Sequence, residues 1–125
     1  MIRRKTLSEE HVRHALEYKE FPQEVIGDAP LVAVALTQSW CPQWRSMLGW
    51  LRELSYREAP EGTDPISVWE LEYDGKPYFR EFLELKERTW GNRLVPYLRY
   101  YRDGELFGTD NYISADRFLS KFGRK

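Results

Sequence analysis

The single cysteine of this 125-residue chain, Cys41, lies in the segment SWCPQW, between an apolar run and a segment with helical periodicity. A thiol at the start of a helix is close to unpaired backbone N–H groups and to the positive end of the helix dipole, which favour thiolate over thiol. Arg45, one turn further on, could add to this effect. A thiolate can attack a disulfide or a peroxide, or form a mixed disulfide with glutathione. Any covalent chemistry is therefore expected to start at Cys41.

The position that would hold the second cysteine of a Cys-x-x-Cys pair is Trp44. In such a pair the second thiol releases the mixed disulfide that the first one forms. A mixed disulfide on Cys41 would therefore persist until an outside thiol released it. The alternative is that Cys41 is unreactive and shielded by Trp40 and Trp44. Both interpretations stay open at this point, and a buried sulfur would argue against the nucleophile.

A strand and a helix flank Cys41. Leu31–Thr37, LVAVALT, is apolar on both alternations, which is typical of a central strand covered by helices on both faces. Beyond Cys41, apolar residues recur at helical spacing at Trp44, Met47, Leu48, Leu51 and Leu54. Pro42 suits the first helical turn, where its missing N–H is no loss. Gly49 indicates a kink or a close packing contact, because glycine is a poor helix former.

The remaining segments carry start and turn signals. Thr6–Glu9, TLSE, has the spacing of a capping box, and the helix that it would start ends before Pro22. Ile66–Leu71 predicts a second strand. Asp103-Gly104, between two alternating segments, predicts a hairpin. Ser114 is expected to cap the last helix.

The expected order of elements is α, β, α, β, α, β, β, α. Strands separated by helices imply right-handed parallel crossovers, and the hairpin adds an antiparallel edge. We therefore expect an α/β fold with a mixed sheet of four or five strands and helices on both faces. The length suits one domain, over residues 1–125.

This order and two local motifs resemble the thioredoxin family. The first motif is strand, Trp40–Trp44 and helix, at the position of the family's Trp-Cys-x-x-Cys. The second is Trp90–Gly108, WGNRLVPYLRYYRDGELFG, which is similar to the family's helix end, cis-proline, strand and hairpin. The resemblance extends over roughly residues 8–122 and implies a thioredoxin-like fold.

The resemblance also implies roles for individual residues. Pro96 would be the cis-proline that faces Cys41, and Val95 would offer its backbone groups to a bound peptide. Gly49 falls where thioredoxins place a helix-kinking proline. Tyr97, after the cis-proline, is bulkier than the threonine common in the family.

Two departures from the family pattern concern the second thiol. Trp44 replaces the resolving cysteine, and Ala35 stands where thioredoxins carry a buried acid six positions before the nucleophile. These two losses agree with each other. The buried acid accepts a proton from the second thiol, and when that thiol is absent, a buried carboxylate brings only a desolvation cost. The resemblance therefore does not extend to dithiol reductase activity, and the chain is at most a monothiol redox protein.

The aromatic residues around the motif have two interpretations. Trp44 begins the apolar stripe of its helix, so packing over the sheet is its favoured role. Alternatively, Trp44 forms an apolar platform around the thiol with Trp40 and Tyr97, on which a peptide or flat ligand binds. Such a rimmed aromatic patch is typical of interaction sites.

The leading functional hypothesis is a monothiol protein in which Cys41 forms mixed disulfides, Pro96 shapes the site and Val95 bonds the substrate backbone. Its partner would be a protein or peptide thiol or disulfide, or a small thiol. The alternative is a non-catalytic module that binds a protein on the same surface. The sequence gives no indication of the oligomeric state.

A glutathione site is a further alternative, because monothiol glutaredoxins also use one cysteine at a helix N-terminus. They hold glutathione beside a TVP cis-proline and an acidic pair after a glycine. Here LVP, Leu94–Pro96, and FGTDN, Phe107–Asn111, are loosely similar, with Asp110 as the anchor for the ammonium group. The lysine usual just before the cysteine motif is missing.

Composition and charge exclude several classes. Lys plus Arg (19) nearly equals Asp plus Glu (20), so the chain lacks the basic excess of nucleic-acid binders. It contains no apolar run of about 18 residues that could span a membrane, and its charged start has no secretory h-region. A single cysteine fits a reducing compartment. We therefore expect a cytoplasmic protein.

Other candidate sites are weak. His11 and His14 lie three residues apart on the first expected helix, but no third metal ligand is evident, so a solvated helix face is favoured and no metal is expected. Glu70 and Glu72 are interpreted as ordinary solvated charge.

Overall fold

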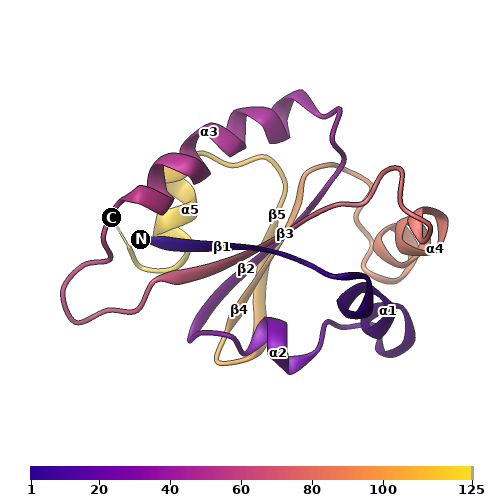
Figure 1. Ribbon diagram of the computed structural model, residues 1–125, viewed down its shortest axis with the longest axis horizontal. Helices are drawn as coiled ribbons and strands as arrows, with labels where there is room; N and C mark the ends of the chain where they lie inside the picture. Colours follow the sequence, from indigo (N-terminus) through magenta and orange to yellow (C-terminus); the bar gives the residue numbers. More distant parts are fainter. Residues whose placement is uncertain (125) are drawn as a thin grey trace.

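The computed structural model describes residues 1–124, which form one mixed five-stranded sheet with helices on both faces (Figure 1). The strands are β1 (Ile2–Thr6), β2 (Leu31–Thr37), β3 (Ile66–Glu72), β4 (Tyr97–Arg102) and β5 (Glu105–Asp110). The helices are α1 (Glu9–Tyr18), α2 (Gln23–Ile26), α3 (Pro42–Tyr56), α4 (Phe79–Glu84) with the π-helical segment η1 (Leu85–Thr89), and α5 (Ala115–Lys121). This is the expected α/β arrangement.

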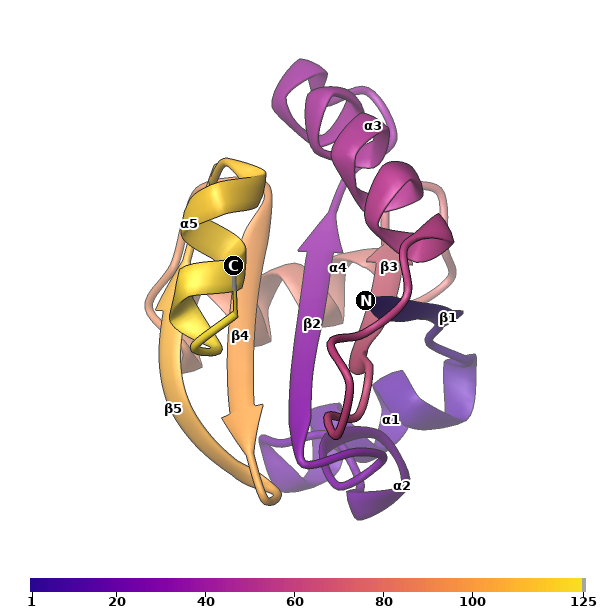
Figure 2. The same ribbon diagram turned by 90° about the vertical axis from the view of Figure 1, so that its left-hand side faces the viewer.

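The strand order is β1-β3-β2-β4-β5. Strands β1, β3 and β2 run parallel, β4 runs antiparallel to β2, and β5 runs antiparallel to β4. Figures 1 and 2 show α3 and α5 on one face of the sheet and α1, α2 and α4 on the other. The parallel crossovers and the antiparallel hairpin therefore follow the sequence expectation.

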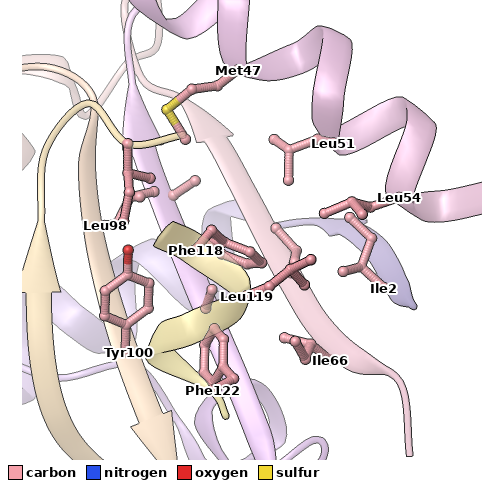
Figure 3. Close-up of a cluster of buried hydrophobic side chains, with 14 of the residues drawn as sticks. Ile2, Met47, Leu51, Leu54, Ile66, Leu98, Tyr100, Phe118, Leu119 and Phe122 are labelled. Carbon is pink, nitrogen blue, oxygen red and sulfur yellow. The ribbon is translucent and has the colours of Figure 1, made fainter. Parts of the chain in front are cut away.

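Two hydrophobic cores lie on the two faces, and β2 belongs to both. On the α3 side Ala33 and Ala35 join Met47, Leu51 and residues of α5 (Figure 3). On the α1 side Val32, Val34 and Leu36 join residues of α1, α2 and α4. The continuous apolar run of β2 thus has the expected cause, which is burial on both faces.

Helix α3 begins where the sequence predicts. Pro42 is its first residue and Cys41 its N-cap. The expected stripe is buried, and its fully buried members are Trp44, Met47, Leu51 and Leu54. Of the two explanations offered for Gly49, a kink or a close packing contact, the packing contact is wrong, because this position is exposed and an added Cβ would meet nothing within 4 Å.

The hairpin and the last helix confirm their sequence signals. Asp103 and Gly104 join β4 to β5 with φ of 49° and 80°, the positive values that a type I′ turn needs. The Ser114 side chain accepts a hydrogen bond from the Arg117 N–H at the start of α5, 3.3 Å away.

The N-terminal region differs from the expectation. The capping box is not TLSE at Thr6, because Thr6 ends β1; Ser8 caps α1 and its box partner is His11. The helix that was expected to run toward Pro22 ends at Tyr18, and a short second helix follows. Strand β1 was not predicted, since IRRKT has little strand pattern and is held by parallel pairing with β3.

Candidate functional site

Cys41 lies between the carboxyl end of β2 and the first turn of α3. Its backbone N–H donates to the Gln38 carbonyl at 3.2 Å. The Ser39 N–H and hydroxyl both donate to the Asp74 carboxylate, at 2.7 and 2.5 Å. The bonds from Ser39 lower the pKa of Asp74 below its usual value. The loop that presents Cys41 is therefore tied to the segment after β3.

The Cys41 thiol is buried. The residue is 3% exposed, and its Sγ–H donates to the Val95 carbonyl oxygen at 3.7 Å. The Arg45 guanidinium donates to the Ser39 carbonyl at 3.4 Å, so it is bound to the loop in front of the cysteine. A sulfur in this position is not presented to a disulfide in solution, which argues against the nucleophile in the conformation seen here.

The two tryptophans of the motif point to different environments. Trp44 is 1% exposed, belongs to the α3-side core and donates its indole N–H to a Glu72 carboxylate oxygen at 2.9 Å. Trp40 is 58% exposed and donates its indole N–H to the Gln38 side chain at 2.6 Å. Packing of Trp44 is thus confirmed, and of the two only Trp40 offers an aromatic surface.

The segment before β4 faces Cys41. The peptide bond between Val95 and Pro96 is cis. Val95 is half-buried and contacts both cores, and Pro96 is buried. Tyr97 is 2% exposed, lies in the α1-side core and accepts a hydrogen bond from Arg99 at 3.1 Å.

The aromatic platform, the alternative interpretation of these residues, is therefore not formed. Tyr97 lies on the opposite face of the sheet from Trp44, because its side chain alternates with that of Leu98, which belongs to the α3-side core. Trp44 itself is buried under α3. Trp40 is the one member of the three that a partner can reach.

Two further apolar side chains, on segments that are bonded near Cys41, are exposed. Leu94 is 62% exposed and directly precedes Val95, while Tyr112 is 48% exposed and its hydroxyl lies 3.4 Å from that of Ser46 in α3. Trp40 directly precedes Cys41, Leu94 directly precedes Val95, which bonds the Cys41 thiol, and Tyr112 follows Asn111, which bonds the Pro96 carbonyl. We call Trp40, Leu94, Val95 and Tyr112 the Cys41 surface. Leu94 could have been found as the neighbour of the expected Val95, but no local signal marks Tyr112.

Val95 leaves a backbone donor free on this surface. Its carbonyl accepts the Cys41 Sγ–H, and within residues 1–124 its N–H has no hydrogen-bond partner. A free N–H beside exposed apolar side chains is a point where an extended chain can pair. Pro42, also expected at the site, is exposed at the start of α3.

A cavity of about 440 Å³ adjoins Trp44 at the carboxyl end of β3, and its acidic residues have structural roles. Glu70 binds the Arg4 guanidinium at 2.6 and 2.8 Å, so it is not the solvated charge that the sequence suggested. Glu72 accepts the Trp44 indole N–H, and Asp74 accepts from Ser39. These carboxylates have structural partners.

Asp110, the candidate anchor of the alternative glutathione site, is paired with a lysine. Its carboxylate lies 3.4 Å from the Lys121 ammonium, and its residue is opposite Leu98 in the β4–β5 ladder. Side chains at this register position point to the α3-side core, since Leu98 does so. The carboxylate is thus directed at α5 and Tyr100.

Metal-ligating side chains do not cluster among the described residues, near the two histidines or elsewhere. Among residues 1–124 no three His, Cys, Asp or Glu side chains lie close enough together to hold a metal ion. His11 belongs to the capping box and contacts Glu24, and His14 bonds the Glu20 carbonyl at 2.9 Å, so neither is simply solvated. In the same part of the chain, no helix is both long enough and apolar enough to cross a bilayer.

Comparison with solved structures identifies the fold. Thioredoxin O2 from Arabidopsis thaliana in the oxidised state superimposes with a TM-score of 0.62 at 17% identity, covering 95% of this chain and 90% of that one. Trxlp from Edwardsiella tarda EIB202 gives 0.60 at 15% identity, with 98% and 100% covered. The oxidised thioredoxin from Plasmodium falciparum gives 0.60 at 16%, with 96% and 98% covered. The chain has the thioredoxin fold.

Sequence comparison adds nothing to this result. No protein-family model matches the chain, and no curated protein matches it significantly. At this level of identity the superpositions establish the architecture, and activity has to be argued from the site.

Proposed function

We propose that this protein binds an extended segment of a partner protein on the Cys41 surface and does not act as a dithiol reductase. The observation that carries the proposal is the contrast in exposure at the site. The Cys41 residue is 3% exposed, whereas Trp40 and Leu94 are 58% and 62% exposed. Exposed aromatic and apolar side chains around a buried reactive group favour recognition over covalent chemistry.

The backbone of Val95 supports an extended partner. Its free N–H can donate to a carbonyl of an extended chain that binds at the Cys41 surface. Main-chain pairing would give affinity for any extended segment, and the apolar side chains would select apolar residues in it. The single cysteine is consistent with work in a reducing compartment such as the cytoplasm.

Monothiol exchange is the second candidate, and the position of Cys41 at the N-cap of α3 favours it. In this reaction the Cys41 thiolate attacks a disulfide of a protein or of oxidised glutathione. The new S–S bond forms as the old one breaks, and the other sulfur leaves as a thiolate. An outside thiol then releases Cys41, because the chain has no second cysteine.

Selection from a displayed library of random peptides tests the leading proposal. Peptides that bind the wild-type protein are expected to bind Cys41→Ser equally well and to lose affinity about tenfold or more for Trp40→Ala or Leu94→Ala, the effect typical of an interface hot spot. Tyr56→Ala is the matched control, since Tyr56 is 82% exposed at the far end of α3.

Failure to select any peptide, or equal binding by Trp40→Ala, would contradict the leading proposal. The second candidate is checked separately with oxidised glutathione and mass spectrometry of the native protein. Rapid addition of one glutathionyl group to wild type but not to Cys41→Ser would favour monothiol exchange.

A further inference from the structure

The loop between Asn92 and Pro96 covers Cys41 and is held by an amide pair. The Asn92 side chain donates to that of Asn111 at 3.1 Å, and the Asn111 side chain donates back at 3.0 Å. Asn111 also donates to the Pro96 carbonyl at 2.8 Å. Because the adjoining Val95 carbonyl accepts the Cys41 Sγ–H, Asn111 fixes the segment that buries the sulfur.

A buried lysine lies under the same loop. Lys86 of η1 is 0% exposed, and its ammonium donates to the Asn92 carbonyl at 2.9 Å. Within residues 1–124 this is the one hydrogen bond of that ammonium, although an ammonium has three N–H donors. The Lys86 carbonyl in turn accepts the Asn92 N–H at 3.0 Å. Lifting Asn92 would therefore uncover the ammonium.

Burying a charged group with one acceptor is unfavourable. The closed loop thus carries a cost that is removed when water reaches Lys86. Opening breaks the amide pair and the Asn111 bond to the Pro96 carbonyl. It also breaks the two bonds between Asn92 and Lys86 and the ion pair of Arg93 with Glu87 at 3.6 Å. Asn111 makes three of these contacts, so it is the residue that contributes most to closure.

We propose that the Asn92–Pro96 loop is a gate over Cys41, which the Asn111 amide holds closed and the buried ammonium of Lys86 biases toward opening. The gate deepens the proposed function, because the loop carries Leu94 and Val95 of the Cys41 surface. The gate also relates partner binding to monothiol exchange, because a disulfide can reach the Cys41 sulfur only when the loop is open. Its test does not depend on the proposed function, because it uses the free protein.

The charged and titratable groups around Lys86 identify it as the pH-sensitive element. Burial lowers the pKa of Lys86 to about 8, while Glu87 on the same segment raises it. The ring of Tyr97 in β4 lies 5.8 Å from the ammonium, and the Arg99 guanidinium lies 6.0 Å from that ring. Tyr73, which directly follows β3, also lies in the α1-side core.

Two of these neighbours titrate outside the weakly alkaline range. Burial raises the pKa of Tyr73 above its usual value. For Arg99, burial acts to lower the pKa, but Tyr101 and Glu20 raise it above the usual value. In the open loop the Lys86 ammonium is hydrated and loses its proton only near the usual 10.5. Between about pH 8 and pH 10.5 the open state therefore binds more protons than the closed state, so opening becomes less favourable as pH rises.

Alkylation of Cys41 by iodoacetamide measures the gate in the free, folded protein. At about neutral pH, Asn111→Ala is expected to react about tenfold faster than wild type. The reason is that loss of the Asn111 hydrogen bonds raises the population of the open loop. Gln43→Ala is the matched control, because it removes an exposed amide two residues from the thiol. Low concentrations of urea separate local from global opening, since only global unfolding shows the full denaturant dependence.

The pH profile tests Lys86. The rate of Cys41 alkylation in wild type is divided by the rate in Lys86→Met, because the fraction of thiolate affects both proteins alike and cancels in this ratio. The ratio is expected to fall about tenfold or more between about pH 7.5 and about pH 9.5, as opening becomes harder in wild type alone. Lys76→Met, which removes an exposed lysine, is the control. The wild-type alkylation rate divided by the Lys76→Met rate should stay constant over the same pH range. An unchanged rate in Asn111→Ala, a rate increase with full urea dependence, or a constant Lys86 ratio would overturn the gate.

Discussion

At the scale of residues, the packing of Trp44 explains why a second cysteine cannot simply be restored at position 44. The indole fills a buried site under α3 and donates to Glu72. A cysteine there would leave a cavity and remove the hydrogen bond to Glu72. The replacement of the second thiol by tryptophan is thus part of the core as well as a change in chemistry.

Trp44→Cys is therefore expected to destabilise the protein by about 3 kcal/mol, in the range of large-to-small core substitutions. Urea unfolding followed by circular dichroism measures this value. Trp40→Cys is the matched control and should change stability by less than about 0.5 kcal/mol, since Trp40 is exposed. Equal effects of the two substitutions would contradict the assigned burial.

Lys86 gives the protein a characteristic pH dependence of stability. Burial lowers its pKa in the folded state from the usual 10.5 to about 8. Below pH 8 the lysine is charged in both states, and the folded state bears the full burial cost. Above pH 8 the folded state loses the proton first, so the unfolded state binds more protons and stability rises with pH.

Wild type is expected to gain up to about 3 kcal/mol between pH 8 and 10.5 from this group. Burial raises the pKa of Tyr73, which removes stability at higher pH, so the gain is best measured below about pH 10. Urea midpoints at several pH values should show the rise in wild type and its loss in Lys86→Met. A rise of equal size in Lys86→Met would assign the effect to another group.

At the scale of elements, α3 tolerates a better helix former at one position. Gly49 is exposed, and an added Cβ meets nothing within 4 Å. Gly49→Ala is expected to stabilise the protein by up to about 1 kcal/mol, because alanine loses less backbone entropy in a helix. The thermal midpoint should rise accordingly.

The control for this prediction is a glycine whose backbone needs its freedom. Gly104 has φ of 80° in the β4–β5 turn, and a Cβ there would approach the Gln23 side chain to 3.0 Å. Gly104→Ala should therefore lower stability, in contrast to Gly49→Ala. A loss of stability in both variants would mean that Gly49 has a role that its contacts do not show.

At the scale of the whole molecule, β2 joins two cores. It contributes Ala33 and Ala35 to the α3 side and Val34 to the α1 side. Neither core can lose its packing without disturbing this central strand. We therefore expect residues 1–124 to unfold in one cooperative transition.

Leu51→Ala on the α3 side and Phe82→Ala on the α1 side test this coupling, since both side chains are buried. Each is expected to cost about 2–5 kcal/mol and to shift one common transition. Tryptophan fluorescence and circular dichroism should give the same midpoint in each variant. Two separated midpoints would show that the two faces unfold independently.

The sequence by itself determined the architecture around Cys41. The doubly apolar Leu31–Thr37, the stripe after Pro42 and the Asp103-Gly104 turn are local signals, because strand burial, helix periodicity and positive φ each depend on neighbouring residues. Strand β1 had no such signal, since its stability comes from pairing with β3, which lies about sixty residues away in the chain.

The tertiary structure decided which side chains a partner can reach. The sequence left open an aromatic platform of Tyr97 and Trp44 beside Trp40, because a side chain's face depends on strand register and helix orientation, which spacing near the motif does not determine. Likewise, the partners of Cys41, Lys86 and Asn111 lie on different elements. The burial of Cys41 and the loop that covers it follow from contacts between distant segments, and those contacts exist only in the folded chain.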